Sequence, residues 1–285
     1  QPMVNRAIGG DLYPPGSTFK ILTVAAALRD GKANADTEMD APDTLTLPGT
    51  NHALSNYAGE SCGNGKVKLS YAFAESCNTP FAQLAMDVGY KDLSSEAEAW
   101  GFDDSQSIPL TVTPSRFPET NSDAETAMAG IGQASVRATP LMMAQVAGTI
   151  ANGGDQMKPY LVAQTLDSDL NVVDTTTPKV ARTPISSQTA QALSSLMQQA
   201  VSDGTGSSAQ VAGVSVAGKT GTAETGSDDG GPVTWFVGFA GTDLSKPSIA
   251  LAIVLDGGEQ TAATGTGGSV AGPMAASIID AAVDQ

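Results

Sequence analysis

The sequence predicts an α+β fold, with helices in the first two thirds of the chain and an antiparallel sheet in the last third. Two observations support this prediction. Apolar residues recur at helical spacing in several segments before position 203, and three apolar runs joined by Gly-, Ser- and Asp-rich turns follow. An Ala- and Ile-rich closing helix at 270–283 could cover the sheet. We therefore expect a helical lobe at roughly 17–203, a sheet lobe at roughly 204–285, and a cleft between them.

The chain's size and charge limit its possible functions. Its 285 residues, 41% of them apolar, suffice for one large domain or two lobes. Lys and Arg total 14 against 30 Asp and Glu, a formal net charge of −16, which argues against nucleic acid and anionic lipid as partners. His52, Cys62 and Cys77 are the only histidine and cysteines. They cannot supply a His- or Cys-based zinc site, and we expect no metal and no cofactor.

The first helix is expected at Ser17–Leu28, where an Ala-rich apolar segment follows the helix-breaking cluster at 13–16. A second helical segment, Ser70–Gly89, has apolar residues at helical spacing but contains Pro80 near its middle. Because proline disrupts a helix interior, we expect two helical pieces that meet near 76–80.

The later elements follow from similar patterns. Ser95–Trp100 predicts a short helix, and 102–123, which contains three prolines, predicts an irregular polar segment. Two longer helices are expected at Pro140–Ala151 and Ser186–Ser202. The expected strands are Val211–Thr222, Pro232–Ala240 and Ile249–Leu255.

Ser17 and Lys20 are the first candidates for catalysis. The run Ser17-Thr18-Phe19-Lys20 separates a hydroxyl and an amine by three positions, and residues so spaced share one face of a helix. A serine hydrolase that lacks a suitable histidine needs another base, and lysine is the usual alternative. Alone the pattern is weak, because about 0.8 such pairs arise by chance in this composition.

The segment Gly59-Glu60-Ser61-Cys62-Gly63 matches the G-x-S-x-G nucleophile elbow in its letters only. An elbow needs a strand before it, a helix after it and a histidine later in the chain. Here His52 precedes the segment, and the surrounding sequence is typical of a loop. We interpret the segment as a Gly-rich surface loop and His52 as a loop or surface residue.

Two further motifs make the Ser–Lys pair part of a larger pattern. Ser76-Cys77-Asn78 has the form S-x-N, and Lys219-Thr220-Gly221 has the form K-T-G, which arises about 0.1 times by chance. The separations are 59 residues (76 − 17) and 143 residues (219 − 76). The three motifs fall at a helix start, a helix junction and a strand, in the order found in penicillin-recognising serine enzymes.

With their surroundings, these motifs resemble the transpeptidase domain of penicillin-binding proteins over nearly the whole chain. The matching segments are Asn5-Arg6-Ala7, Tyr13 to Lys20, Glu75 to Phe81, Gly130 to Gln133, Thr139 to Leu141, Ala151 to Gly154, Gly218 to Glu224 and Trp235 to Phe239. The sequence is class B-like and most similar to the actinobacterial penicillin-binding protein A type. The resemblance implies a penicillin-binding/serine β-lactamase-like fold, with an antiparallel sheet flanked by helices and an active site in the cleft.

The chain departs from the class B pattern in two places. Ser17 comes too early, because the family has a helix and two strands of its sheet before the nucleophile. We therefore expect the anchor and the N-terminal region to lie outside this chain. Ala134 occupies a position where many members have a second glycine after Gly-x-Gly-Gln, which leaves the shape of that loop open.

The resemblance implies a reaction with peptidoglycan stem peptides that end in D-Ala-D-Ala. Ser17 would attack the penultimate carbonyl and expel the last D-Ala. Lys20 would be the base and must be neutral to accept the proton. Ser76 would pass a proton to the leaving amine, and Asn78 would hold both Lys20 and the substrate backbone.

The third motif would bind the other end of the substrate. Lys219 would supply positive potential, which lowers the pKa of Lys20 and attracts a terminal carboxylate. Thr220, Gly221 and Thr222 would form the carboxylate site, with the two threonine hydroxyls as donors. The backbone N–H groups of Ser17 and Thr222 would form the oxyanion hole.

Several assignments stay open in the sequence. Gln133 and Trp235 fit either core packing or a cleft wall, and Glu224 fits an exposed strand end slightly better than a role beside the site. An exported domain favours a Cys62–Cys77 disulfide, and the alternative is a pair of buried free thiols.

The expected activity is that of a serine-type D-Ala-D-Ala transpeptidase that β-lactams acylate. The alternatives are a D,D-carboxypeptidase, a β-lactamase with Glu119 as its deacylating carboxylate, and a β-lactam sensor domain. Stem peptides and β-lactam antibiotics are the expected partners, together with a membrane glycan polymerase. We expect an extracytoplasmic, membrane-anchored protein of which this chain is a soluble domain, because its apolar runs fall short of the roughly 18–20 residues of a membrane span.

Overall fold

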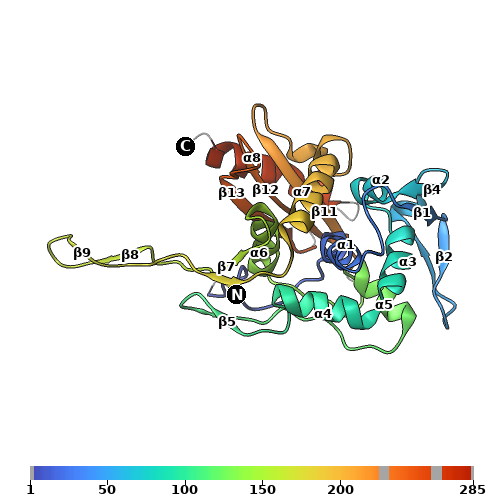
Figure 1. Ribbon diagram of the computed structural model, residues 1–285, viewed down its shortest axis with the longest axis horizontal. Helices are drawn as coiled ribbons and strands as arrows, with labels where there is room; N and C mark the ends of the chain where they lie inside the picture. The colour runs from blue at the N-terminus through green and yellow to red at the C-terminus, as the bar shows by residue number, and fades with distance from the viewer. Residues whose placement is uncertain (1–2, 225–230, 258–264, 284–285) are drawn as a thin grey trace.

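A computed structural model describes residues 3–224, 231–257 and 265–283 (Figure 1). The α-helices are α1 (Lys20–Arg29), α2 (Leu69–Ala74), α3 (Thr79–Val88), α4 (Tyr90–Trp100), α5 (Asp123–Gly130), α6 (Pro140–Ala151), α7 (Ser187–Ser202) and α8 (Gly272–Val283). Shorter helical turns are η1 (Gly16–Phe19), η2 (Tyr57–Gly59), η3 (Ser207–Ala209) and η4 (Gly267–Ala271). Within these ranges, no helix combines the length and the apolar character needed to cross a membrane.

The main sheet has three antiparallel strands in the order β11 (Ser215–Ala223), β12 (Val233–Gly241) and β13 (Ile249–Leu255). Gly221 on β11 lies opposite Trp235 on β12, which in turn lies opposite Val254 on β13. The central strand β12 is buried along its whole length. The antiparallel sheet predicted for the last third of the chain is therefore confirmed.

Alternate residues of β12 enter two different cores. Trp235, Val237 and Phe239 belong to the larger core, which also contains residues of α1, α6 and α7. Phe236 and Ala240 belong to a second core with residues of α8. Successive side chains of a strand point to opposite faces of a sheet, so this central strand must be covered on both sides. Helices α6 and α7 cover one face and α8 covers the other.

This layering differs from a division by sequence position. Helices α6 and α7 precede residue 204, yet they pack on β13 and β11 respectively. Helices α1 to α5 and their connections lie further from the sheet and include the S-x-N junction (Figure 1). A boundary at 203/204 therefore precedes the strands of the main sheet along the chain, whereas packing joins helices α6 and α7 from before it to that sheet.

Five short antiparallel pairs surround the core. They are β1 (Glu38–Ala41) with β4 (Gly65–Lys68), β2 (Thr44–Thr46) with β3 (Ala53–Ser55), β5 (Gln106–Ser107) with β6 (Thr111–Val112), β7 (Gln156–Met157) with β10 (Val180–Arg182), and β8 (Gln164–Leu166) with β9 (Val172–Thr175). The β8–β9 hairpin projects away from the rest of the molecule as a long arm (Figure 1). Residues of both its strands are exposed.

The helix boundaries follow the predictions closely at the site. Helix α2 ends at Ala74 and α3 begins at Thr79, with Pro80 in its first turn, so the break expected near 76–80 is present. The largest differences are at two starts: α4 begins five residues before the predicted Ser95, and β11 begins at Ser215 instead of Val211. Gly213, with a φ of 77°, turns the chain just before β11, and Val211 pairs with Val214 in an isolated bridge.

Helix α5 was not predicted. Its small residues give little periodicity, but its start carries a recognisable cap, because the Ser122 hydroxyl accepts a hydrogen bond from the Glu125 N–H. A Ser followed three residues later by Glu is a common helix-start pattern. Helix α5 leads into the loop at 130–133, in which Ile131 and Gln133 line the cleft described next.

Candidate active site

A cleft of about 1130 Å³ lies between the S-x-N junction and strand β11. Its lining includes Ser17, Ser76, Asn78, Thr220 and Thr222. The remaining lining residues lie in segments at 52–62, 71–77, 128–133 and 205–208, together with Glu224, Pro232, Thr266 and Gly268. The structure thus brings residues of all three motifs to one cavity, although they lie up to 203 positions apart in the chain (220 − 17).

Ser17 lies in the turn η1, directly before α1, and is half-buried at the cleft. The turn is held from two sides by close backbone approaches. The Gly16 N–H donates to the Gly132 carbonyl at 3.0 Å, and a Cβ on Gly132 would lie only 2.0 Å from the Gly16 oxygen. A Cβ on Gly16, whose φ is 52°, would lie 2.7 Å from the Thr222 oxygen. These glycines allow β11 and the 130–133 loop to approach the backbone beside Ser17.

Lys20 is fully buried one turn after Ser17. Its Nζ donates to the Ser76 carbonyl at 2.7 Å, to the Cys77 carbonyl at 2.9 Å and to Asn78 Oδ1 at 2.9 Å. It also lies 5.3 Å from the centre of the Phe81 ring. Within the described part of the chain, these three oxygens, and not Ser17 Oγ, accept the hydrogen bonds of Lys20.

The two buried lysines have strongly altered acidity. Burial lowers the pKa of Lys20 well below its usual range, and the nearby charge of Lys219 lowers it further. The acceptors of Lys20 are neutral carbonyl and amide oxygens, which stabilise an ammonium less than a carboxylate does. The cost of burying the charge therefore exceeds the stabilisation from these hydrogen bonds, and the pKa falls. Burial also lowers the pKa of Lys219 to about 7, with Glu75 acting in the opposite direction. Near neutral pH the site therefore holds less than two full positive charges.

The S-x-N motif occupies the bend between α2 and α3. Ser76 has a φ of 61°, a left-handed conformation that costs a non-glycine residue about 1 kcal/mol or more. Such strain is maintained only where surrounding contacts impose it. Here the Ser76 carbonyl binds Lys20, and the Cys77 N–H donates to Ala72.

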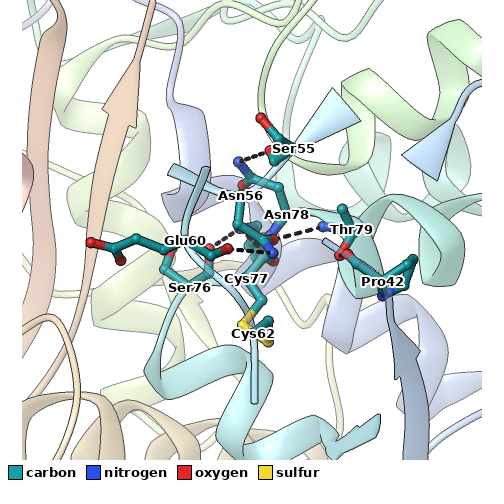
Figure 2. The surroundings of a disulfide bond; sticks show 10 residues. Pro42, Ser55, Asn56, Glu60, Cys62, Ser76, Cys77, Asn78 and Thr79 are labelled. Carbon is teal, nitrogen blue, oxygen red and sulfur yellow. Dashed lines mark hydrogen bonds between the residues drawn. A yellow bond between two sulfur atoms is a disulfide. The ribbon is translucent and has the colours of Figure 1, made fainter. Parts of the chain in front are cut away.

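A loop at 53–62 holds this bend from the outside (Figure 2). The Asn78 side chain donates through Nδ2 to the Ser55 carbonyl at 3.2 Å, which orients its Oδ1 toward Lys20. Asn56 Oδ1 accepts from the N–H groups of Asn78 at 2.8 Å and Thr79 at 3.2 Å. Its Nδ2 donates to the Glu60 carbonyl at 3.1 Å.

Cys62 and Cys77 form a disulfide, with their Cα atoms 5.9 Å apart (Figure 2). Both residues are almost completely buried. The bond connects the 53–62 loop to the middle residue of the S-x-N motif, so loop and motif are joined by a covalent link as well as by Asn56. Cys62 belongs to the segment with the G-x-S-x-G letters, which the structure forms as a loop that precedes β4.

The K-T-G motif lies within β11. Lys219 is fully buried beneath the cleft, with its Nζ 5.6 Å from the Phe73 ring centre and 3.2 Å from the Thr220 carbonyl. A Cβ on Gly221 would lie 2.7 Å from the Pro15 carbonyl, so glycine allows β11 to pass directly beside η1. Thr222 Oγ1 accepts a hydrogen bond from the Gly267 N–H at 3.1 Å.

The residues whose roles the sequence left open have distinct positions. Gln133 and Glu224 line the cleft. Trp235 is fully buried and donates through Nε1 to the Pro14 carbonyl at 2.9 Å, so it holds the segment before Ser17 and is not part of the cleft wall. Glu119 is exposed and lies outside the cleft lining, and His52 is an exposed residue at the rim.

Two residues that contact the motifs were missed by the sequence analysis. Asn56 holds the bend at Asn78, and Thr205 Oγ1 lies 2.6 Å from Thr220 Oγ1. Neither belongs to a short motif, and both act through contacts between distant segments. The local sequence predicts a loop around Asn56 and another at Gly204-Thr205-Gly206. It does not predict which distant segments those loops contact.

The fold, with the three motifs gathered at one cleft, is that of the penicillin-recognising class of proteins. A family model described as the penicillin-binding protein transpeptidase domain matches residues 1–280. The chain belongs to this family.

Among individual relatives, the chain is 42% identical to the peptidoglycan D,D-transpeptidase PbpA of Mycolicibacterium smegmatis, covering 100% of this chain and 57% of that protein. It is 40% identical to PbpA of Mycobacterium tuberculosis, over 99% of this chain and 57% of the relative. The chain thus spans little more than half the length of these curated relatives.

Solved structures give the same picture. The chain matches penicillin-binding protein A from M. tuberculosis, in a ceftriaxone acyl-enzyme complex, with a TM-score of 0.92 and 40% identity, over 99% of this chain and 63% of that one. It also matches the D,D-transpeptidase domain of a peptidoglycan glycosyltransferase from Eggerthella lenta, with a TM-score of 0.87 and 33% identity, over 98% of this chain and 67% of that one. The penicillin-binding protein fold predicted from the three motifs is therefore confirmed.

Proposed function

We propose that this chain is the catalytic domain of a peptidoglycan D,D-transpeptidase that β-lactams inhibit. The observation that supports this most directly is the convergence of Ser17, Ser76, Asn78, Thr220 and Thr222 on one cleft, with Lys20 and Lys219 buried directly behind it. The relatives named peptidoglycan D,D-transpeptidase and the acyl-enzyme complexes of a neighbour support the same chemistry.

In the proposed reaction, Ser17 Oγ attacks the penultimate D-Ala carbonyl of a donor stem peptide. Neutral Lys20 takes the serine proton, as its lowered pKa allows. The backbone N–H groups of Ser17 and Thr222 stabilise the developing oxyanion. Ser76 passes a proton to the leaving nitrogen, the C–N bond breaks, and D-Ala departs from an acyl-Ser17 ester.

An amine of a second stem peptide then attacks the ester carbonyl. Its proton returns through the same groups, Ser17 is regenerated, and a new amide joins the two stems. Asn78 keeps Lys20 in place through their hydrogen bond. The hydroxyls of Thr220 and Thr222 bind the terminal carboxylate of the donor, and Lys219 supplies positive potential beneath it. Gly221 keeps this strand close to the nucleophile.

A D,D-carboxypeptidase would form the same acyl-enzyme and release it to water. The two activities differ in how the acceptor binds, and the relatives' names favour transpeptidation. A β-lactamase would require a carboxylate that activates water at the ester. Glu119, the candidate from the sequence, lies away from the cleft lining and does not support that role.

The remaining parts of the proposal concern the complete protein. We propose that it acts outside the cytoplasm, anchored to the cell membrane by a region beyond this chain, and alongside a membrane glycan polymerase. A peptidoglycan substrate requires the extracytoplasmic location, and a polymerase would supply new glycan strands to the cross-linking site.

Labelling with a penicillin, followed over hours by mass spectrometry, tests the proposed site. A stable adduct on Ser17, absent from Ser17→Ala, is the expected result. Labelling that persists in Ser17→Ala would contradict the assignment, and rapid hydrolysis of the drug would indicate a β-lactamase. A stem-peptide donor supplied with a separate amine acceptor should then give a cross-linked product, whereas D-Ala release without cross-linking would indicate a carboxypeptidase.

A further inference from the structure

Thr205 connects the two sides of the cleft. It lies in the turn between α7 and η3, is half-buried, and lines the cavity. Its N–H donates to the carbonyl of Ala74 at 3.1 Å, and its Oγ1 lies 3.3 Å from that same oxygen. On its other side, Oγ1 lies 2.6 Å from Thr220 Oγ1. Ala74 ends α2 two residues before Ser76, so one side chain touches both the S-x-N side and the K-T-G strand.

The turn is held tightly against α2. A Cβ on Gly204 would lie 2.3 Å from the Ala74 carbonyl oxygen, so the backbone there approaches as closely as a glycine permits. A Cβ on Gly268 would lie 2.5 Å from the Thr205 carbonyl oxygen. The Thr205 backbone therefore has little freedom, and its hydroxyl is presented to Thr220 from a fixed position.

The contact between the two hydroxyls allows two arrangements of protons. A hydroxyl has one proton to donate and can accept through its lone pairs. If Thr205 donates to the Ala74 carbonyl, Thr220 must donate to Thr205, and Thr220 then offers the cleft only a lone pair. If Thr205 donates to Thr220, the Thr220 proton is available to a ligand in the cleft. Only the second arrangement lets Thr220 donate to an anion.

The hydroxyl of Thr222 is in the arrangement that leaves its proton for a ligand, and its donor is a backbone N–H group. The Gly267 N–H donates to Thr222 Oγ1, so a backbone donor that cannot reverse occupies the oxygen. The Thr222 proton is then directed to another acceptor. Thr205 gives Thr220 an equivalent donor, but this donor is a hydroxyl and can also turn to Ala74.

We propose that Thr205 is a positioning residue for carboxylate recognition, which donates its proton to Thr220 so that Thr220 donates to the bound carboxylate. A carboxylate entering the cleft selects this arrangement, because it accepts the Thr220 proton and offers no proton in return. The Ala74 carbonyl keeps its hydrogen bond from the Thr205 N–H in both arrangements. The proposal rests on the proposed role of Thr220 in binding the substrate carboxylate.

The test compares Thr205→Val, which removes the hydroxyl and keeps the shape, with Thr205→Ser, which keeps the hydroxyl. The probes are benzylpenicillin and its methyl ester, and the measurement is the second-order rate constant of Ser17 acylation. Thr205→Val should slow acylation by benzylpenicillin about tenfold, the effect of one lost hydrogen bond. The ester, which has no carboxylate, should lose less than about twofold, and Thr205→Ser should stay within about twofold of the parent chain.

A double variant tests whether the effect passes through Thr220. Thr205→Val combined with Thr220→Val should be no slower with benzylpenicillin than Thr220→Val alone, since the relay is already broken. Thr165→Val, on the exposed strand β8, is the matched control and should leave both rates unchanged.

Three outcomes would overturn the proposal. The first is that Thr205→Val slows acylation by benzylpenicillin and by its methyl ester equally. The second is that the double variant is slower than Thr220→Val alone, so that the two losses add. The third is that Thr220→Val slows acylation by benzylpenicillin whereas Thr205→Val does not. In the last case the role of Thr220 would survive and only the positioning role of Thr205 would fail. If Thr220→Val favoured acylation by benzylpenicillin over the methyl ester as strongly as the parent chain does, the proposed carboxylate site would be wrong. The positioning role of Thr205 would then be wrong as well.

Discussion

Lys20 Nζ and Asn78 Oδ1 lie 2.9 Å apart, and each group is held by further partners of its own. Lys20 also donates to two backbone carbonyls of the S-x-N motif, and the Asn78 amide is oriented by the Ser55 carbonyl. Lys20 is therefore fixed by the bend between α2 and α3 and not by Ser17. In the proposed reaction, this keeps the base in place while Ser17 Oγ attacks the substrate.

The first prediction concerns the pH dependence of acylation. Lys20 must be neutral to accept the serine proton, so the rate should rise as pH increases through its pKa. Lys219→Met removes the like charge that lowers this pKa. The rising limb of the rate profile with a penicillin methyl ester should therefore move to higher pH. The ester is the right probe because it does not need Lys219 to attract a carboxylate. A limb that stays in place or moves to lower pH would contradict the coupling.

The same variant gives a stability prediction. The pKa of Lys219 is about 7 when folded and returns to the ordinary lysine value when unfolded, so the buried ammonium destabilises the fold below about pH 7. Lys219→Met should therefore raise the melting temperature, since methionine fills similar space without a charge. The gain should be largest at pH 6 and shrink between pH 7 and 10, because the unfolded state then binds more protons than the folded state. Lys246→Met, which removes an exposed lysine, is the control. A gain that grows with pH would be inconsistent with a buried charge.

Much of the fold and site was predictable because the information lies within short stretches of sequence. The S-x-x-K, S-x-N and K-T-G motifs each sit at an element boundary or in a strand that local patterns identify. Pro80 correctly placed the break between α2 and α3. The central strand β12 was recognisable because a strand buried on both faces is a nearly continuous apolar run, here broken by Thr234.

The rest depends on contacts between distant segments, which local patterns do not contain. Asn56 lies 22 positions before Asn78, and Thr205 lies 131 positions after Ala74. The start of α4 was missed because its first residues, from Tyr90 to Ser94, have little apolar periodicity, and packing against α1 and α3 stabilises them. Tertiary contacts override weak local preference in such segments.

Ala134 gives a third prediction. It occupies the position where many family members have glycine, and its φ is 55°, so alanine adopts the left-handed conformation that suits glycine. Ala134→Gly should therefore stabilise the protein by about 1 kcal/mol without changing acylation, because the residue is exposed. Ala281→Gly, on the exposed side of α8, should instead destabilise by about 1 kcal/mol. Equal effects of the two substitutions in urea denaturation would rule out strain at Ala134.

The disulfide leads to a fourth prediction. Cys62 and Cys77 are separated by 15 positions, and closing a loop of this size contributes about 3 kcal/mol to stability. The Cys62→Ala/Cys77→Ala variant should unfold at a lower urea concentration, and dithiothreitol should lower the midpoint of the parent chain but not of the variant. Titration of the denatured, unreduced parent chain should find no free thiol. Two titratable thiols would show that the bond does not form in solution.

Asn56 provides the last prediction, which separates positioning from catalysis. Its Oδ1 accepts from the N–H groups of Asn78 and Thr79, both at the start of α3. Asn56→Ala leaves these donors without their partner and should slow acylation about tenfold, with a loss of ~1–3 kcal/mol in stability. Asn56→Asp keeps an acceptor at the helix N-terminus but loses the donor to the Glu60 carbonyl, so it should restore only part of the activity that Asn56→Ala loses. Because Asn78 presents its Oδ1 to Lys20, the slowed Asn56→Ala variant should also show a shifted rising limb in its pH–rate profile. A loss of activity that Asn56→Asp does not restore, or a slower rate with an unchanged profile, would mean that Asn56 supports the loop without positioning the base.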